Sequence, residues 1–467
     1  MSDAESLMWR VDSDPVLSSA FANLTILDRR PNMEFLATQL NHSLASFPRL
    51  AQRVMNHGAG TPTWEQVPDF DAHNHLHRIK LPRGSTFRDV CQLAVALTKQ
   101  PIDRTKPLWD FFSLEGLPNG QAAMVQRIHH AMADGEASVR LSMLFLDMAR
   151  QSCPIPPPLK AGHGTPLPDD TPTSDDAKEQ SHTFDPMELG ATITAIGAGL
   201  GSYVTKFFSD PSRLAKTAHT MTHWPSELGN GVDIVKSMVG QLYSDPAHSA
   251  LWTPRSLQRD LHVIAMPFAD AKNVAAYLGG TINDVFLTGV LAGAGKYHRA
   301  HNVFIDELRV AIPMSTRTKD SGGNAFVPTR ALLPAGIEDP IALFAEVHDR
   351  LSVTKNDRGL PQLDKLLGLA NALPTNVLTS LAKQQTKTVD FAASNVRAAP
   401  ISLYIGGAKI LANHPIGPIS GAAFNITMLS YAGVITMGMH VDTAAVPDSD
   451  FLRDCIAESF AELVALL

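Results

Sequence analysis

The segment 129–135, with the sequence HHAMADG, constrains this chain more than any other. Residues 122–128 before it predict a strand, and residues 136–150 after it predict an amphipathic helix. A neutral imidazole can take a proton from a hydroxyl near pH 7, and a glycine after the acid permits a sharp turn. The segment therefore places a candidate base at a strand-to-helix junction. Its candidate catalytic residues are His129, His130, Asp134 and Gly135.

Two interpretations of this segment involve no acid–base chemistry. In the first, both histidines form hydrogen bonds in a core and Asp134 caps the helix that follows. In the second, the segment binds a metal ion. Neighbouring strand residues such as His129 and His130 point to opposite faces, however, and cannot easily share one ion. The chain has no H-E-x-x-H segment and no clustered cysteines, so we expect no metal site.

A third interpretation is acyl transfer with one histidine as the general base. Opposite orientations of the two rings would let one ring face a cleft while the other packs. The chain has no G-x-S-x-G segment, which would mark a serine nucleophile on a sharp turn. We therefore expect a substrate hydroxyl to attack an activated acyl group directly, without an acyl-enzyme.

The length of 467 residues exceeds one ordinary core and predicts two domains. Hydrophobic residues make up 44% of the chain and charged residues 18%, which is enough to bury a large core. A formal charge of -7 with no long basic block argues against nucleic-acid binding. The cysteines are too scattered for a zinc or disulfide framework and fit a reducing compartment. They are Cys91, Cys153 and Cys455.

Residues 153–186 are rich in proline, aspartate and serine and predict an extended linker. The linker divides the chain into an N-terminal domain, 1–152, and a C-terminal domain, 187–467. Residue periodicity predicts strands at 20–27, 122–128, 260–266, 308–312 and 331–333, and a hairpin of 424–430 and 434–441. It predicts helices at 28–47, 87–97, 136–150, 268–278, 283–299, 341–353 and 451–467. No glycine-rich phosphate-binding loop is present in the sequence.

The first residues, Met1 to Glu5, carry acid where a signal peptide needs basic and then apolar residues, so we expect a cytoplasmic protein. Residues 189–208 are long enough to cross a bilayer and carry only one charge, Lys206. Their glycines and small apolar side chains favour a closely packed helix or an interdomain segment. Peripheral contact with a membrane or lipid droplet is the second interpretation, and a true membrane span is the least favoured.

HHAMADG resembles the H-H-x-x-x-D-G motif of the bacterial wax ester synthase/diacylglycerol acyltransferases. These belong to the superfamily of CoA-dependent acyltransferases that includes chloramphenicol acetyltransferase and the condensation domains. Further segments resemble this family in the same order along nearly the whole chain. They are 101–103 (PID) with 107–109 (PLW), 278–285 (LGGTINDV), 313–317 (PMSTR) with 323–324 (GN), 425–433 and 446–448 (VPD).

The resemblance implies an α/β fold of two chloramphenicol-acetyltransferase-like domains with the active-site channel between them. Acyl-CoA would enter as co-substrate from one side and the acyl acceptor from the other, with no further cofactor. His130 would be the general base, and His129 would support packing or orient the base. Asp134 would be a structural anchor that pairs with Arg317, although Arg317 could also be an ordinary surface arginine.

Five other residues are candidates for substrate binding. Asn283 and Asp284 lie where a helix begins, so backbone donors there suit an anionic group such as an oxyanion or a CoA phosphate. Helix capping alone is an equally good explanation for these two residues. Weaker candidates for lining the channel are Asn324, Ser394 and Asn395.

Two segments depart from the family pattern. Residues 394–400 read SNVRAAP where the family has S-N-V-P-G-P, and 250–253 read ALWT where it has P-L-N. Both departures leave the histidine motif intact, so they bear on substrate choice more than on chemistry. We therefore expect an O-acyltransferase that acts on diacylglycerol or a long-chain alcohol. The alternatives are a related acyltransferase for a glycolipid or carrier-bound hydroxyl, and a non-catalytic lipid-binding homologue.

Overall fold

The computed structural model describes residues 1–56, 61–133, 135–150, 247–315, 326–356, 371 and 375–467. All of these residues belong to one unit of the chain. The second unit, Pro156–Ser237, lies wholly outside the described residues. The predicted linker at 153–186 and the apolar segment at 189–208 also lie outside them.

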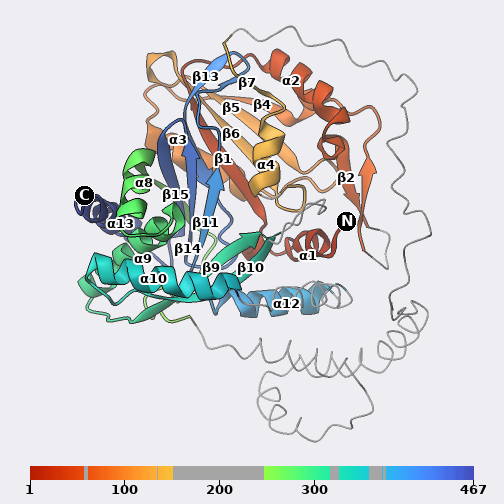
Figure 1. Cartoon of the computed structure of the whole chain (residues 1–467). Coiled ribbons are helices and arrows are strands. Elements are labelled where there is room, and N and C mark those ends of the chain that lie inside the picture. The colour runs from red at the N-terminus through yellow and green to blue at the C-terminus, as the bar shows by residue number, and fades with distance from the viewer. Residues whose placement is uncertain (57–60, 134, 151–246, 316–325, 357–370, 372–374) are drawn as a thin grey trace, which may run out of the picture. The chain divides into compact units, whose positions relative to one another are not determined.

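The described residues form both helices and strands throughout the chain (Figure 1). The helices are α1 (Asp3–Val11), α2 (Met33–His42), α3 (Phe87–Lys99), α4 (Gly135–Ser142), α8 (Phe268–Tyr277), α9 (Ile282–Ala300), α10 (Pro340–Asn356), α12 (Thr375–Thr386) and α13 (Ser449–Val464). The strands are β1 (Ala20–Leu27), β2 (Gln52–Met55), β3 (Thr63–Gln66), β4 (Leu76–Lys80), β5 (Trp109–Glu115), β6 (Ala122–His129), β7 (Leu146–Asp147), β8 (Arg259–Pro267), β9 (Glu307–Ser315), β10 (Phe326–Pro334), β11 (Phe391–Arg397), β12 (Tyr404–Ile405), β13 (Ala408–Ile416), β14 (Phe424–Tyr431) and β15 (Val434–Asp442).

Two large mixed sheets organise these elements. The first has the strand order β4-β5-β6-β1-β13-β12-β7, and the second has the order β10-β9-β11-β14-β15-β8. Strand β4 runs parallel to β5, and β11 runs parallel to both β9 and β14. The remaining pairs in these two sheets are antiparallel. The fold is therefore mixed α/β, as the sequence predicts.

We call the first sheet with the helices packed on it the first half, and the second sheet with its helices the second half. Strand β13 joins these two halves. It comes from the C-terminal part of the chain yet pairs antiparallel with β1 of the first sheet, with Leu24 opposite His414. It also passes close over the second sheet, because a Cβ on Gly438 of β15 would lie 1.8 Å from the Pro415 carbonyl oxygen. Only glycine permits so close an approach of the two backbones. Strands β12 and β13 follow the predicted linker in sequence, yet they belong to the first sheet, whose other strands all precede the linker.

The second half has its core around α9, which packs against α13, α10 and α8. A Cβ on Gly293 of α9 would lie 2.5 Å from the Ile456 Cα of α13, so the absent side chain sets how closely these helices pack. Figure 1 shows α8, α9, α10 and α13 gathered beside this sheet. In the first half, α3 packs on the sheet through Val90 and Ala94 and also reaches Leu261 of β8.

Most of the predicted elements are confirmed. β1 has the predicted bounds, and β6, β8, α3, α8 and α9 differ from prediction by no more than two residues at either end. The predicted hairpin is formed by β14 and β15, with Ala432 and Gly433 at positive φ in the turn. Thr281 caps α9 as expected. Local signals were sufficient here because caps, turns and amphipathic periodicity coincide.

Two predicted helices are wrong in extent. The helix predicted at 28–47 begins at Met33, because Asp28 pairs with Lys409 of β13 through its backbone N–H and its carboxylate. The helix predicted at 136–150 ends at Ser142. Beyond it, Phe145 packs 5.3 Å from the Phe111 ring and β7 pairs with β12. Both corrections come from pairing with strands that lie far away in sequence.

Within the described residues, no single helix is long and apolar enough to cross a membrane. Helices α8 and α9 together satisfy the length and composition, but they are bent by 95°. The same residues hold no group of three or more histidine, cysteine or acidic side chains arranged to bind a metal ion. Cys91 and Cys455 are buried thiols.

Candidate active site

The histidine motif lies at the end of β6, where three segments meet. The His130 N–H donates to the Ser19 carbonyl at 3.0 Å, and the His129 N–H donates to the Leu108 carbonyl at 3.0 Å. Leu108 belongs to the PLW segment, so this segment contacts the histidine motif directly. The side chain of His129 is buried and that of His130 is half-buried, beside Phe21 at 4.5 Å between ring centroids.

The His129 ring is held from two sides. The Ala131 N–H donates to its Nδ1 at 3.0 Å, so a neutral ring carries its proton on Nε2. Nε2 lies 3.4 Å from Asp12 Oδ1, and the Trp9 ring packs edge-on at 6.0 Å between centroids. Burial disfavours the Asp12 carboxylate, but contacts from His129, Ser19 and Arg104 outweigh it and lower the pKa of Asp12. The His129 ring is thus held in place by neighbours on both sides.

A buried ion pair supports the turn after His130. Glu5 of α1 is 0% exposed, and Arg49 Nη1 donates to its Oε1 at 2.6 Å. The same Nη1 lies 3.3 Å from the Ala131 carbonyl and 3.5 Å from the Met132 carbonyl. Trp64 Nε1 donates to the other carboxylate oxygen of Glu5 at 3.3 Å. Helix α1 therefore braces the main chain that follows His130.

The predicted pair of Asp134 and Arg317 lies outside the described residues, and so does Asn324. Gly135 is the first residue of α4. Helix α4 packs against β11 of the second sheet. The histidine motif is thereby connected to the strand that carries Ser394 and Asn395.

Asn283 and Asn395 lie together on the second half, and Ser394 precedes Asn395 on β11. Asn395 Nδ2 donates to Asn283 Oδ1 at 3.5 Å, which joins β11 to the first turn of α9. Asn283 and Ser394 are half-buried and Asn395 is exposed. Val396 and Ala398, just beyond, pack against the core of the first half. Strand β11 thus carries Ser394 and Asn395 next to residues that pack on the first half.

Asp284 has a different role from its neighbour Asn283. Its buried carboxylate accepts hydrogen bonds from the Thr281 N–H at 2.7 Å and the Thr281 hydroxyl at 2.9 Å. His348 Nδ1 donates to the same oxygen at 2.9 Å. These are the contacts of a capping box, so the structure favours helix capping over substrate binding for Asp284.

The two departures from the family pattern differ in location. Trp252, in the altered 250–253 segment, is fully buried and packs on Phe424 with 5.2 Å between ring centroids. The altered 250–253 segment therefore contributes to the core of the second half. Arg397, in the altered 394–400 segment, is exposed at the end of β11, close along the strand to Asn395.

Sequence reasoning missed the residues of α1 and of the segment before β1. Glu5, Asp12 and Ser19 all contact the histidine motif or its support, yet the sequence pattern predicts no role at the site for any of them. The one available signal was the capping box of Ser2 and Glu5, which marks the start of a helix. Nothing local indicates that this helix packs beside residues 129–132.

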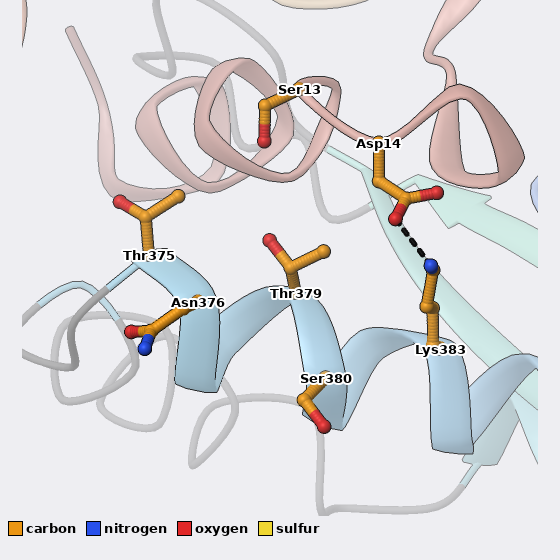
Figure 2. Close-up of a pocket in the computed structure, with 7 residues that line it drawn as sticks. All are labelled: Ser13, Asp14, Thr375, Asn376, Thr379, Ser380 and Lys383. Carbon is orange, nitrogen blue, oxygen red and sulfur yellow. Dashed lines mark ion pairs between the residues drawn. The ribbon is translucent and has the colours of Figure 1, made fainter.

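A polar groove of about 510 Å³ lies between the end of α1 and α12 (Figure 2). It is lined by Ser13, Asp14, Thr375, Asn376, Thr379, Ser380 and Lys383. Lys383 pairs with Asp14 across it, and Arg10 donates to the Asn371 carbonyl at 2.6 Å. The two charged groups of the groove neutralise each other. These contacts attach α12 to α1 although the two helices are far apart in sequence.

Two family models match the chain. The wax ester synthase/diacylglycerol acyltransferase catalytic domain matches residues 17–286, more than half of the chain, and the C-terminal domain of the same family matches 322–464. A probable diacylglycerol O-acyltransferase of Mycobacterium tuberculosis, tgs1, is 28% identical over 97% of this chain and 93% of its own length. A second relative from that organism, also named as a candidate diacylglycerol O-acyltransferase, is 27% identical over 98% and 90%.

Solved structures share the fold. The wax ester synthase/diacylglycerol acyltransferase from Marinobacter aquaeolei is similar with a TM-score of 0.61, at 17% identity, over 98% of this chain and 97% of that one. A mutant starter condensation domain of rhizomide synthetase, in complex with C8-CoA and Leu-SNAC, gives a TM-score of 0.56 at 13% identity over 100% and 93%. The fold therefore consists of two chloramphenicol-acetyltransferase-like halves. The chain belongs to the wax ester synthase/diacylglycerol acyltransferase family.

Proposed function

We propose that the protein transfers a long-chain acyl group from acyl-CoA to the hydroxyl of diacylglycerol or of a long-chain alcohol. The observation that carries the proposal is the difference between the two histidines. The His129 ring is enclosed between Asp12 and the Ala131 N–H, whereas the His130 ring is half-buried beside Phe21. This arrangement gives His129 an orienting role and makes His130 the candidate base.

In the proposed reaction, His130 removes the proton of the acceptor hydroxyl, and the resulting oxygen attacks the thioester carbonyl. The tetrahedral intermediate collapses with cleavage of the C–S bond. The proton on His130 then passes to the CoA thiolate, which leaves an ester, free CoA and a neutral imidazole. A positioned base of this kind contributes about 10²- to 10⁴-fold in rate. The condensation domain in complex with C8-CoA supports acyl-CoA as the donor.

The acceptor is proposed from the relatives. Their names favour diacylglycerol, and the family description adds wax-ester synthesis. Because diacylglycerol resides in lipid, we also propose that the protein is cytoplasmic and works at the surface of a membrane or lipid droplet. Flotation of the purified protein with triacylglycerol droplets tests this point, and a protein that stays entirely in the aqueous fraction contradicts it.

The function is tested with purified protein, labelled long-chain acyl-CoA and one acceptor per reaction, either diacylglycerol or a long-chain alcohol. We expect labelled ester from wild type and none above background from His130→Ala. A matched control is His73→Ala, which removes an exposed ring that contacts Asp71 and Glu34. Absence of ester with both acceptors contradicts the proposal, as does release of CoA thiol without ester, which indicates a thioesterase.

A further inference from the structure

Asp12, at the C-terminal end of α1, contacts three groups. Its Oδ1 accepts the Ser19 N–H at 2.8 Å and lies 3.4 Å from His129 Nε2. Its Oδ2 accepts from Arg104 Nη2 at 3.3 Å. Arg104 also donates to the Trp9 carbonyl at 2.9 Å, and its guanidinium lies 4.1 Å from the centre of the Trp9 ring. The carboxylate is therefore fixed by neighbours on several sides.

These contacts reach the main chain on both sides of His130. Asp12 holds the N–H of Ser19, and the carbonyl of Ser19 accepts the His130 N–H at 3.0 Å. Asp12 also faces the His129 ring, which accepts the Ala131 N–H at 3.0 Å. One carboxyl group thus braces residues 129, 130 and 131 together.

The contacts also set the tautomer of His129. Because Nδ1 accepts the Ala131 N–H, a ring with its proton on Nδ1 would place two donors face to face. The carboxylate beside Nε2 favours the tautomer that carries its proton there. Loss of the carboxylate leaves the Ala131 N–H as the single group that sets the tautomer, which weakens the preference and lets the ring turn more easily.

We propose that Asp12 is a positioning residue for His130, acting through the His129 ring and the Ser19 backbone. The inference rests on the proposed role of His130 as general base. Asp12 lies before residue 17, where the match to the family's catalytic-domain model begins. It also differs from the acid expected from the motif, Asp134. A displacement of about 1 Å at a catalytic group can cost about 100-fold in rate, so support of this kind has a measurable effect.

The test compares four variants. Asp12→Asn removes the charge, and His129→Asn keeps an acceptor near the Nδ1 position but removes the group that faces Asp12. The third is the double variant. The matched control is Asp14→Asn, which lies two residues after Asp12 and removes the ion pair between Asp14 and Lys383. For each we measure kcat, KM for acyl-CoA and for the acceptor, and the fraction folded.

We expect Asp12→Asn and His129→Asn each to lower kcat about tenfold or more, with both KM values within about twofold of wild type. The double variant should be no slower than the slower single variant, because both changes break one connection. Asp14→Asn should retain kcat within about twofold. A purely structural role for Asp12 would lower the folded fraction and leave the kcat of the folded protein unchanged.

Two results overturn the proposal: a kcat of folded Asp12→Asn within twofold of wild type, or losses that multiply in the double variant. If Asp12→Asn does not fold, His129→Asn decides, and full activity there overturns the proposal. Histidine ¹⁵N NMR separates this test from the proposed function. Absence of ester from wild type would refute the proposed acyltransferase function. Independently of that result, unchanged His130 ring signals in Asp12→Asn would refute the positioning role of Asp12.

Discussion

The two sides of the candidate site are built differently. On the first side, the segment around His130 is held by two carboxylates from α1 and its C-terminal end, Asp12 beside the buried His129 ring and the fully buried Glu5 paired with Arg49. On the second side, apart from the buried capping residue Asp284, the described candidates are the amides Asn283 and Asn395 and the hydroxyl of Ser394. They are half-buried or exposed, and one contact of 3.5 Å joins Asn395 to Asn283. Charged contacts shielded from water hold geometry more strongly than exposed amide contacts do.

This difference suggests a division of work between the two sides. The first sheet would hold the reacting group in place, and the second would adapt to the acceptor. The departure from the family pattern at 394–400 falls on the second side, whereas the segment 129–135 on the first side is intact. Each prediction below changes one side and compares it with the other.

The largest effect is expected from His130→Ala on the first side. Loss of the base should lower kcat about 10³-fold while leaving the affinity for acyl-CoA within about threefold. Steady-state kinetics and calorimetric titration of acyl-CoA measure the two quantities. A variant that keeps more than a tenth of wild-type kcat would contradict a role as the base.

The second prediction concerns the pH dependence of stability. Burial lowers the pKa of His440 on β15 to about 4, and its Nδ1 donates to the Gly417 carbonyl at 2.8 Å. Between the ordinary histidine pKa near 6.5 and about 4, the unfolded chain binds more protons, so stability falls as the pH falls through this range. The loss is on the order of 3 kcal/mol. On the first side, the pKa of Asp12 is lowered, so its stabilisation is lost only as the pH falls below 3.8.

Urea unfolding at several pH values between 7.5 and 4 measures this difference. His440→Asn keeps a donor for the Gly417 carbonyl and removes the titrating ring, so its stability should fall less steeply with decreasing pH than that of wild type. Equal slopes for the two proteins would show that His440 does not titrate in this way.

The third prediction compares two buried carboxylates. Glu5→Gln leaves Arg49 without its charged partner and should reduce the free energy of unfolding by about 2–3 kcal/mol. Because Arg49 also contacts the Ala131 carbonyl, kcat of the folded protein should fall as well. Asp284→Asn weakens a helix cap on the second side and should cost about 1–2 kcal/mol with kcat of the folded protein changed less than twofold. Thermal unfolding and activity per folded molecule separate the two cases, and equal kcat losses would refute the comparison.

The smallest effect is expected on the second side. Asn283→Ala and Asn395→Ala should each change kcat less than about fivefold, because their contact is long and partly exposed. They should instead change the ratio of activities on diacylglycerol and on a long-chain alcohol. Competition between the two acceptors in one reaction measures that ratio. An unchanged ratio in both variants would show that Asn283 and Asn395 do not determine which acceptor is used.

The sequence alone was sufficient for the α/β class and for most helices and strands. These features depend on periodicity, caps and the alternation of strand residues, which are local. The place of β13 in the first sheet and the early end of α4 were not predictable, because both depend on pairing across hundreds of residues. The contact of Asp12 with His129 was missed for the same reason.

The prediction for Asp284 illustrates a second limit. An acid in the first turn of a helix has the same sequence pattern whether it caps the helix or faces a ligand. Only the positions of Thr281 and His348 decide in favour of the cap. The local sequence thus predicted correctly that Asp284 lies at the start of a helix, but it did not decide between helix capping and ligand binding.

The most direct test of the account is a rapid-quench experiment with wild type and His130→Ala, labelled acyl-CoA and a saturating acceptor. Direct transfer from a base-activated hydroxyl predicts that ester and free CoA form together in wild type. It also predicts no label on the protein, and a loss of about 10³-fold in the rate for His130→Ala. Label that accumulates on the protein before ester forms, or an unchanged rate in His130→Ala, would contradict the account.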